Sequence, residues 1–138
     1  MNLECSSKGN KLYSAFYARI SVNGVMDSIE NHYQLAKRFG DSPPPKTWRD
    51  SKGRKPTHFV VGTKEFPVEY LSAYYKVLWI KYLDANPNLV AYAQRYDTFS
   101  DMFRGKSINC QADCVRDYVK KGRDYLMLQC QEFLSLYK

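Results

Sequence analysis

The spacing of apolar residues predicts a helix in the middle of the chain. Over residues 69–85, Leu71, Tyr75, Leu78 and Tyr82 recur at intervals of three and four. Residues with this spacing share one stripe of a helix, where they can face a core together. The pattern therefore predicts an amphipathic helix across the whole segment.

Two more helical segments are expected towards the C-terminus. Asn86 is a favourable N-cap and Pro87 suits the first helical position, so a helix is expected from here to about residue 95. The last helical region covers residues 111–136, and Gly122 is expected to interrupt it because glycine weakens a helix interior.

The N-terminal half carries patterns typical of short strands. Residues 11–22 are rich in aromatic and β-branched side chains and are predicted as a strand. Asn23 and Gly24 tolerate the positive φ angles that a type I′ turn needs, so a short return strand is expected from residue 25. A second short hairpin is predicted around residues 62–64.

A capped helix is expected after the first hairpin. Asp27 or Ser28 can serve as the N-cap, and Glu30 lies three residues after Asp27, as in a capping box. Gly40 is a typical residue just beyond a helix end. The helix is therefore predicted over residues 29–39.

Three polar residues of this predicted helix share one face. Glu30, Gln34 and Lys37 stand at positions i, i+4 and i+7, and side chains with this spacing lie one above another. A carboxylate, an amide and an amine are thus expected to line the same side of the helix.

Two long loops separate the predicted elements. Residues 41–56 hold four prolines and Trp48, together with the basic residues Lys46, Arg49, Lys52, Arg54 and Lys55. Residues 97–109 form the second loop, and long loops in a compact domain are often functional. The chain is accordingly predicted to be one α+β domain over residues 1–138, mainly helical, with short β-hairpins.

Composition narrows the class of protein. A chain of 138 residues can build one core, and its net charge of +7 attracts polyanions such as nucleotides or nucleic acid. The N-terminus lacks the apolar run of a signal peptide, so we expect a cytoplasmic protein with reduced thiols. Zinc at Cys110 and Cys114 is disfavoured, because only His32 and His58 could complete the site. We expect no metal and no cofactor.

Nine residues in the N-terminal third follow a pattern of fixed order and spacing. They are Ser14, Phe16, Tyr17, Gly24, Ser28, Glu30, Tyr33, Gln34 and Lys37. This pattern resembles the opening signature of the NADAR (YbiA-like) superfamily. There, a Ser-x-Phe-Tyr segment precedes a Gly-centred hairpin, and a Ser-x-Glu-x-x-Tyr-Gln-x-x-Lys segment follows it.

Two further segments resemble the same superfamily. KYLDANPNL is similar to a segment on its helix pair, and DMFRGKSIN is similar to a segment near a catalytic acid, with Asp101, Gly105 and Asn109 in place. The chain departs from the pattern in two ways. Arg104 stands where the family has Trp, and the Arg-Trp-Asp segment expected before the long helix is absent, since Trp48 lies too early to align with it.

The resemblance implies a YbiA-like fold and N-glycosidic bond chemistry on an ADP-ribosyl or ribosylated nucleotide-like substrate. Such cleavage builds positive charge on the ribose, which a nearby carboxylate can stabilise. Glu30 and Asp101 are the expected catalytic pair, one as base or electrostatic stabiliser and the other as acid or ribose anchor. The expected ligand-binding residues are Ser14, Phe16, Tyr17, Tyr33, Gln34, Lys37, Trp48, Arg104 and Asn109.

Other interpretations of these residues stay open. Glu30 could merely complement the helix dipole, and Asp101 could cap a turn. A pocket of this fold could bind an ADP-ribose-type nucleotide without turning it over. The basic loop with Trp48 could instead bind single-stranded nucleic acid. The expected partner is a nucleotide or ADP-ribose-like molecule, or ADP-ribosylated nucleic acid, and no membrane.

Overall fold

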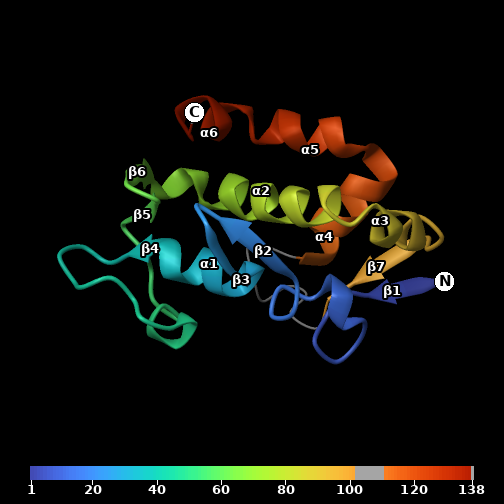
Figure 1. The fold of residues 1–138 in the computed structure, drawn as a ribbon, viewed down its shortest axis with the longest axis horizontal. Coiled ribbons are helices and arrows are strands. Elements are labelled where there is room, and N and C mark those ends of the chain that lie inside the picture. Colours follow the sequence, from blue (N-terminus) through green and yellow to red (C-terminus); the bar gives the residue numbers. More distant parts are fainter. Residues whose placement is uncertain (102–110, 138) are drawn as a thin grey trace.

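A long central helix organises the domain (Figure 1). The computed structural model describes residues 1–101 and 111–137. The helices are α1 (Ile29–Ala36), α2 (Leu71–Asp84), α3 (Pro87–Ala93), α4 (Gln111–Arg116), α5 (Arg123–Gln129) and α6 (Gln131–Tyr137). In Figure 1, α5 and α6 cover one side of α2, whereas α1, β2 (Arg19–Val22) and β3 (Val25–Ser28) lie on the other. The α+β prediction is confirmed.

The described strands are short and form three small sheets. Strands β2 and β3 form an antiparallel hairpin. The other pairings are β1 (Asn2–Glu4) parallel to β7 (Thr98–Ser100), and an antiparallel sheet of β4 (Lys37–Arg38), β5 (His58–Val61) and β6 (Lys64–Pro67). Because none of the sheets is large, the helices supply most of the packing surface.

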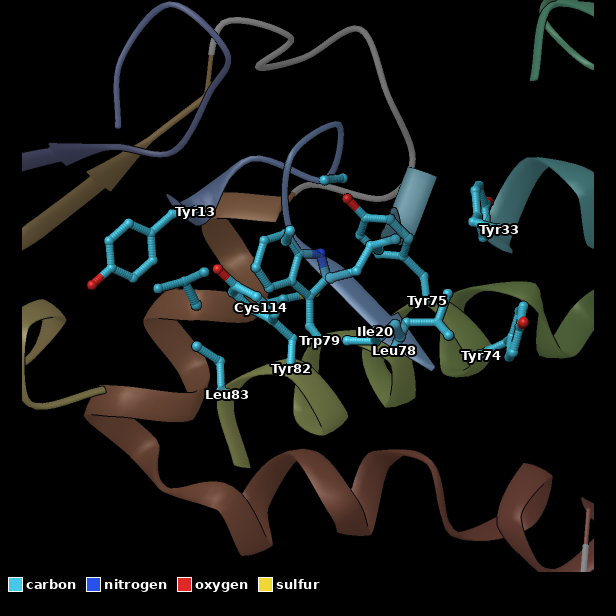
Figure 2. Packing of buried hydrophobic residues seen from close by; sticks show 14 of the residues in the cluster. Tyr13, Ile20, Tyr33, Tyr74, Tyr75, Leu78, Trp79, Tyr82, Leu83 and Cys114 are labelled. Carbon is cyan, nitrogen blue, oxygen red and sulfur yellow. The ribbon is translucent and has the colours of Figure 1, made fainter. Parts of the chain in front are cut away.

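The core lies on both sides of α2. Figure 2 shows Tyr75, Trp79 and Tyr82 leaving α2 on the side away from the C-terminal helices. On the opposite side, the Phe133 ring of α6 lies 5.9 Å from the Tyr74 ring, centroid to centroid. The predicted stripe is confirmed, since all four of its residues are buried. Aromatic rings fill much of this interior because each buries a large apolar area.

Both predicted hairpins are present. In the first turn, Asn23 has a φ of 51° and Gly24 a φ of 81°, as a type I′ turn requires. In the second, Gly62 has a φ of 65°. The interruption at Gly122 is also confirmed: its φ of 102° separates a π-helical turn at Asp117–Lys121 from α5.

The strand predicted over residues 11–22 is largely wrong. Lys11–Tyr13 form a 3₁₀ turn, and the Asn10 side chain accepts a hydrogen bond from the Leu12 amide at its start. The Ser14 carbonyl then accepts the amides of the residues three and four positions later. These local hydrogen bonds replace a strand ladder, so only the last four residues of the segment are extended.

The loop predicted over residues 97–109 begins with a strand. Thr98–Ser100 form β7, which pairs in parallel with β1 at the N-terminus. The sequence pattern predicted neither β7 nor β1. Two three-residue strands that meet from distant parts of the chain leave no local periodicity. In the described ranges, no helix combines the length and the apolar character needed to cross a bilayer.

Candidate functional site

The start of α1 is fixed against the segment that precedes β2. The Ser28 hydroxyl caps the helix by accepting the Asn31 amide at 3.0 Å. The Ile29 and Glu30 amides donate to carbonyl groups of residues 18 and 15, at 2.8 and 2.9 Å. Amides that a helix leaves unpaired at its first turn are thus used to dock it. Ser28, not Asp27, is the N-cap.

The Glu30 carboxyl lies half-buried, and four polar side chains act on it. Gln34 Nε2 donates to Glu30 Oε1 at 2.9 Å. Burial raises the pKa of Glu30 above its usual value, and the charge of Asp101 raises it further. The Gln34 hydrogen bond and the charges of Lys37 and Lys52 act in the opposite direction but do not cancel the effect of burial. The group is therefore disposed to hold a proton.

Lys37 lies near enough to Glu30 for their charges to interact, but it is held by a strand and not by the predicted helix. Helix α1 ends at Ala36, three residues early, and Lys37 is extended with φ −65° and ψ 147°. It begins β4 and pairs with Phe59 of β5. Its Nζ still lies 4.6 Å from the centroid of the Tyr33 ring. Burial lowers the pKa of this amine, whereas the neighbouring Glu30 raises it.

Gln34 offers an acceptor that the described residues leave unused. Its Oε1 is buried and has no hydrogen-bond partner within residues 1–101 and 111–137. Its backbone carbonyl, by contrast, accepts the hydroxyl of the buried Ser51 at 2.8 Å, which ties the basic loop to α1. A buried amide oxygen without a partner is unfavourable unless a bound group donates to it.

Tyr75 of α2 contributes to this neighbourhood and was missed by the sequence pattern. Its ring lies 5.0 Å from that of Tyr33 and nearly edge-on. Burial raises the pKa of Tyr75 strongly, and both Glu30 and Asp101 contribute to the rise. The helical periodicity marked Tyr75 only as a core residue. Nothing in the spacing showed that it faces two carboxylates.

Three of the predicted aromatic residues, Phe16, Tyr17 and Trp48, lie nearer the surface than the buried Tyr33. The Phe16 and Trp48 rings meet edge-to-face, with centroids 5.6 Å apart. Tyr17 is 52% exposed, and Lys11 Nζ lies 5.0 Å from its ring centroid. Ser14 is completely buried, and its hydroxyl accepts the Phe16 amide at 3.3 Å, which shapes the turn that presents both rings.

The remaining predicted site residues divide into two groups. Asp101 is described, and its charge acts on both Glu30 and Tyr75, so the two predicted carboxylates lie within electrostatic range of each other. Arg104 and Asn109 lie outside the described residues. The part of the chain that the structure describes contains no group of three or more His, Cys, Asp or Glu suited to hold a metal.

A match to a family model confirms that the protein is a member of the NADAR superfamily, as the residue pattern around Glu30 predicted. The comparison with family models is more specific. The model for the DarT1-associated NADAR antitoxin matches residues 2–138, and the chain belongs to that family. The comparison with curated proteins gives no match.

Proposed function

We propose that this protein is an N-glycosidase that removes an ADP-ribosyl group from a nucleotide-like or nucleic-acid substrate. The observation that carries the proposal is the environment of Glu30. Its carboxyl is half-buried, is held by Gln34, has a raised pKa and shares its surroundings with Lys37 and Asp101. Carboxyl groups tuned by burial next to a second carboxylate are typical of acid–base sites.

The proposed reaction is hydrolysis of the N-glycosidic bond that joins the ADP-ribosyl group to the base. The bond between the base nitrogen and the anomeric carbon of the terminal ribose of the ADP-ribosyl group breaks, and a water oxygen forms the new bond to that carbon. One water proton goes to a carboxylate, and the departing nitrogen takes up a proton. Glu30 is suited to move these protons, because a raised pKa brings a carboxyl closer to neutral pH. Asp101 would anchor the ribose or stabilise its positive charge.

Other residues of the site suit the rest of an ADP-ribosyl group. Lys37 supplies a cation for a phosphate, and the Gln34 Oε1 acceptor suits a ribose hydroxyl. Tyr33 is placed between Lys37 and Tyr75, where it could pack against the ribose or base. Arg104 and Asn109 keep their predicted roles in ligand binding as part of the proposal.

The family description supplies the biological context. A DarT1-associated antitoxin that acts in this way would reverse an ADP-ribosylation made by its toxin. Removal of the modification, and not merely binding of the free nucleotide, would then be the protective step. The expected partner is ADP-ribosylated nucleic acid.

The test is to follow ADP-ribose release from ADP-ribosylated oligonucleotide by mass spectrometry. We expect free ADP-ribose with the natural protein, and a loss of at least a hundredfold in rate with Glu30→Gln, as general acid–base groups typically contribute about that much. Glu30→Gln should still bind ADP-ribose, because the change keeps the shape of the side chain. Glu69→Gln is the matched control, since Glu69 is an exposed acid in a first turn.

Two results would contradict the proposal. Binding of the intact substrate without any product over hours would identify a pocket that only sequesters the nucleotide. An unchanged release rate in Glu30→Gln would show that the reaction takes place elsewhere.

A further inference from the structure

Three aromatic rings that are exposed or half-buried, with exposed cations beside them, lie next to the candidate site. The structure places Lys11 Nζ 5.0 Å from the centroid of the Tyr17 ring. Phe16 follows, 37% exposed, and meets Trp48 edge-to-face. We name this set the cation–aromatic strip, and its members are Lys11, Tyr17, Phe16, Trp48, Arg49 and Lys52.

Two elements that are distant in sequence build the strip. One is the turn before β2, and the other is the 3₁₀ turn Trp48–Asp50 in the basic loop. In Figure 1, the blue chain before β2 and the green chain after β4 both lie on the side away from α5 and α6. The Phe16–Trp48 contact joins them. The Glu30 amide donates to the Ala15 carbonyl at 2.9 Å, next to Phe16 in the chain, so the strip borders the candidate site. The charge of Lys52 also acts on Glu30.

Hydrogen bonds from residues outside the strip hold the turn that carries Trp48. Asp50 Oδ2 accepts the amides of Lys46 and Thr47 at 2.9 and 3.1 Å, which fixes the turn that carries Trp48. Ser51 anchors the same turn to α1. The Phe16–Trp48 contact adds to these hydrogen bonds, whereas the exposed Tyr17 ring and the cations are not needed to hold the loop together. An exposed aromatic ring of this kind is typical of a contact surface.

We propose that the cation–aromatic strip binds a single strand of nucleic acid and guides it to the site at Glu30. Rings that can stack on bases, flanked by cations that can meet phosphates, suit a nucleotide chain. The guidance role rests on the proposed function, but strand binding itself does not. An acidic peptide would use the cations and leave the rings without a partner.

The strip has a matched counterpart elsewhere on the molecule. Lys121 Nζ lies 4.8 Å from the Tyr125 ring, and the Arg95 guanidinium lies 5.6 Å from the Tyr92 ring. These are also a Lys–Tyr pair and an Arg–aromatic pair with exposed cations, but they lie on the helical part of the chain. They permit a control with the same types of residue and the same loss of charge.

The experiment measures binding of an unmodified single-stranded DNA oligonucleotide of about 12 nucleotides across a salt series. The test variant is Lys11→Gln with Arg49→Gln, and the control variant is Lys121→Gln with Arg95→Gln. Loss of two phosphate contacts should reduce the slope of log affinity against log salt by about 1.4 in the test variant. The control should keep the slope of the natural protein.

A second variant tests stacking rather than charge. Trp48→Ala should weaken binding of the oligonucleotide by about fivefold to a hundredfold, as loss of one stacked base does. It should not weaken binding of inorganic polyphosphate, which has the charge of a strand but no bases. Equal losses in test and control variants, or equal effects of Trp48→Ala on both polymers, would overturn the proposal.

ADP-ribose release separates this proposal from the catalytic one. The variant Lys11→Gln with Arg49→Gln should release ADP-ribose from a modified mononucleotide at the normal rate, but slowly from a modified oligonucleotide. Glu30→Gln should bind the oligonucleotide normally. If the natural protein releases no ADP-ribose and still binds the strand through these residues, only the proposed function has failed.

Discussion

At the scale of a single residue, the fold partly buries the Glu30 carboxyl, which makes its charged form less favourable than it is in water. Burial raises its pKa more than the Gln34 hydrogen bond and the charge of Lys37 lower it. A side chain selected only to complement the helix dipole would lie in water with an ordinary pKa. The structure thus favours a functional interpretation of Glu30 over the purely local one.

This placement has a consequence for stability that can be measured. Since the folded protein holds the Glu30 proton more tightly than the unfolded chain, stability falls as pH rises from the usual glutamate pKa of 4.5 through the raised pKa. Gln resembles the protonated form and lacks this decline. Glu30→Gln should therefore have the higher Tm at pH 7, with the difference shrinking to zero below about pH 4.

The measurement is thermal unfolding by circular dichroism between pH 4 and pH 8. Glu69→Gln removes the same charge from an exposed position and should leave Tm nearly unchanged at every pH. A Glu30→Gln variant that is less stable than the natural protein at pH 7 would mean that the carboxylate is mainly a structural group.

At the scale of the element, α1 shows why a helix can end before its pattern does. Residues 37–39 continue the helical pattern, but Lys37 and Arg38 pair with β5 instead. Arg38 Nη1 donates to the carbonyl groups of Leu35, Ala36 and Lys37, at 2.8, 3.1 and 2.9 Å. These hydrogen bonds satisfy carbonyl groups at the end of the helix, where no further turn follows.

Arg38→Ala should therefore weaken the end of α1 and the strand that positions Lys37. We expect a loss of about 1–3 kcal/mol in the free energy of unfolding, because carbonyl groups are left without a charged donor. Arg19→Ala removes the same charge and one exposed hydrogen bond of 3.3 Å. This control should change the free energy of unfolding by less than about 0.5 kcal/mol. Urea denaturation measures both. Similar losses in the two variants would show that the Arg38 contacts are not what ends the helix.

The elements also show which features a sequence pattern can predict. The turn at Asn23 and Gly24, the cap at Ser28 and the pairing of Glu30 with Gln34 follow from residues a few positions apart, and all are present. Glu30 itself was singled out as a site residue by the resemblance to the NADAR superfamily, and its role in a site stays a prediction. By contrast, the β1–β7 pairing, the contact of Tyr75 with the site and the route of Lys37 arise from residues distant in sequence, which leave no local signal.

At the scale of the whole molecule, an aromatic cluster packs against α2 and meets the candidate site at β5, where Phe59 pairs with Lys37. Phe133 of α6 lies at the centre of this cluster, with ring centroids 5.0 to 6.5 Å from five others, namely Phe59, Phe66, Tyr70, Tyr74 and Tyr137. A mainly apolar cavity of about 290 Å³ lies beside it, between α2 and the C-terminal helices. The candidate site lies across α2, around α1.

This separation predicts opposite effects for two variants. Phe133→Ala should lower the free energy of unfolding by about 3–5 kcal/mol, because a fully buried ring is lost next to an existing cavity. This loss is a large fraction of the total stability of a typical domain, which is about 5–15 kcal/mol. The molecules that remain folded should nevertheless bind ADP-ribose with unchanged affinity. Phe133→Leu, which keeps most of the volume, should lose less. Glu30→Gln should behave in the opposite way, with turnover lost and stability at pH 7 raised rather than lowered.

Unfolding curves and calorimetric binding, both measured at low temperature, test this contrast. Phe59 offers a route by which the variants could influence each other, since β5 contacts both Phe133 and Lys37. A Phe133→Ala protein that is folded but binds ADP-ribose several times more weakly would show that strain passes through β5 to Lys37. The position of Lys37 would then depend on the packing of the whole domain and not only on α1 and β4.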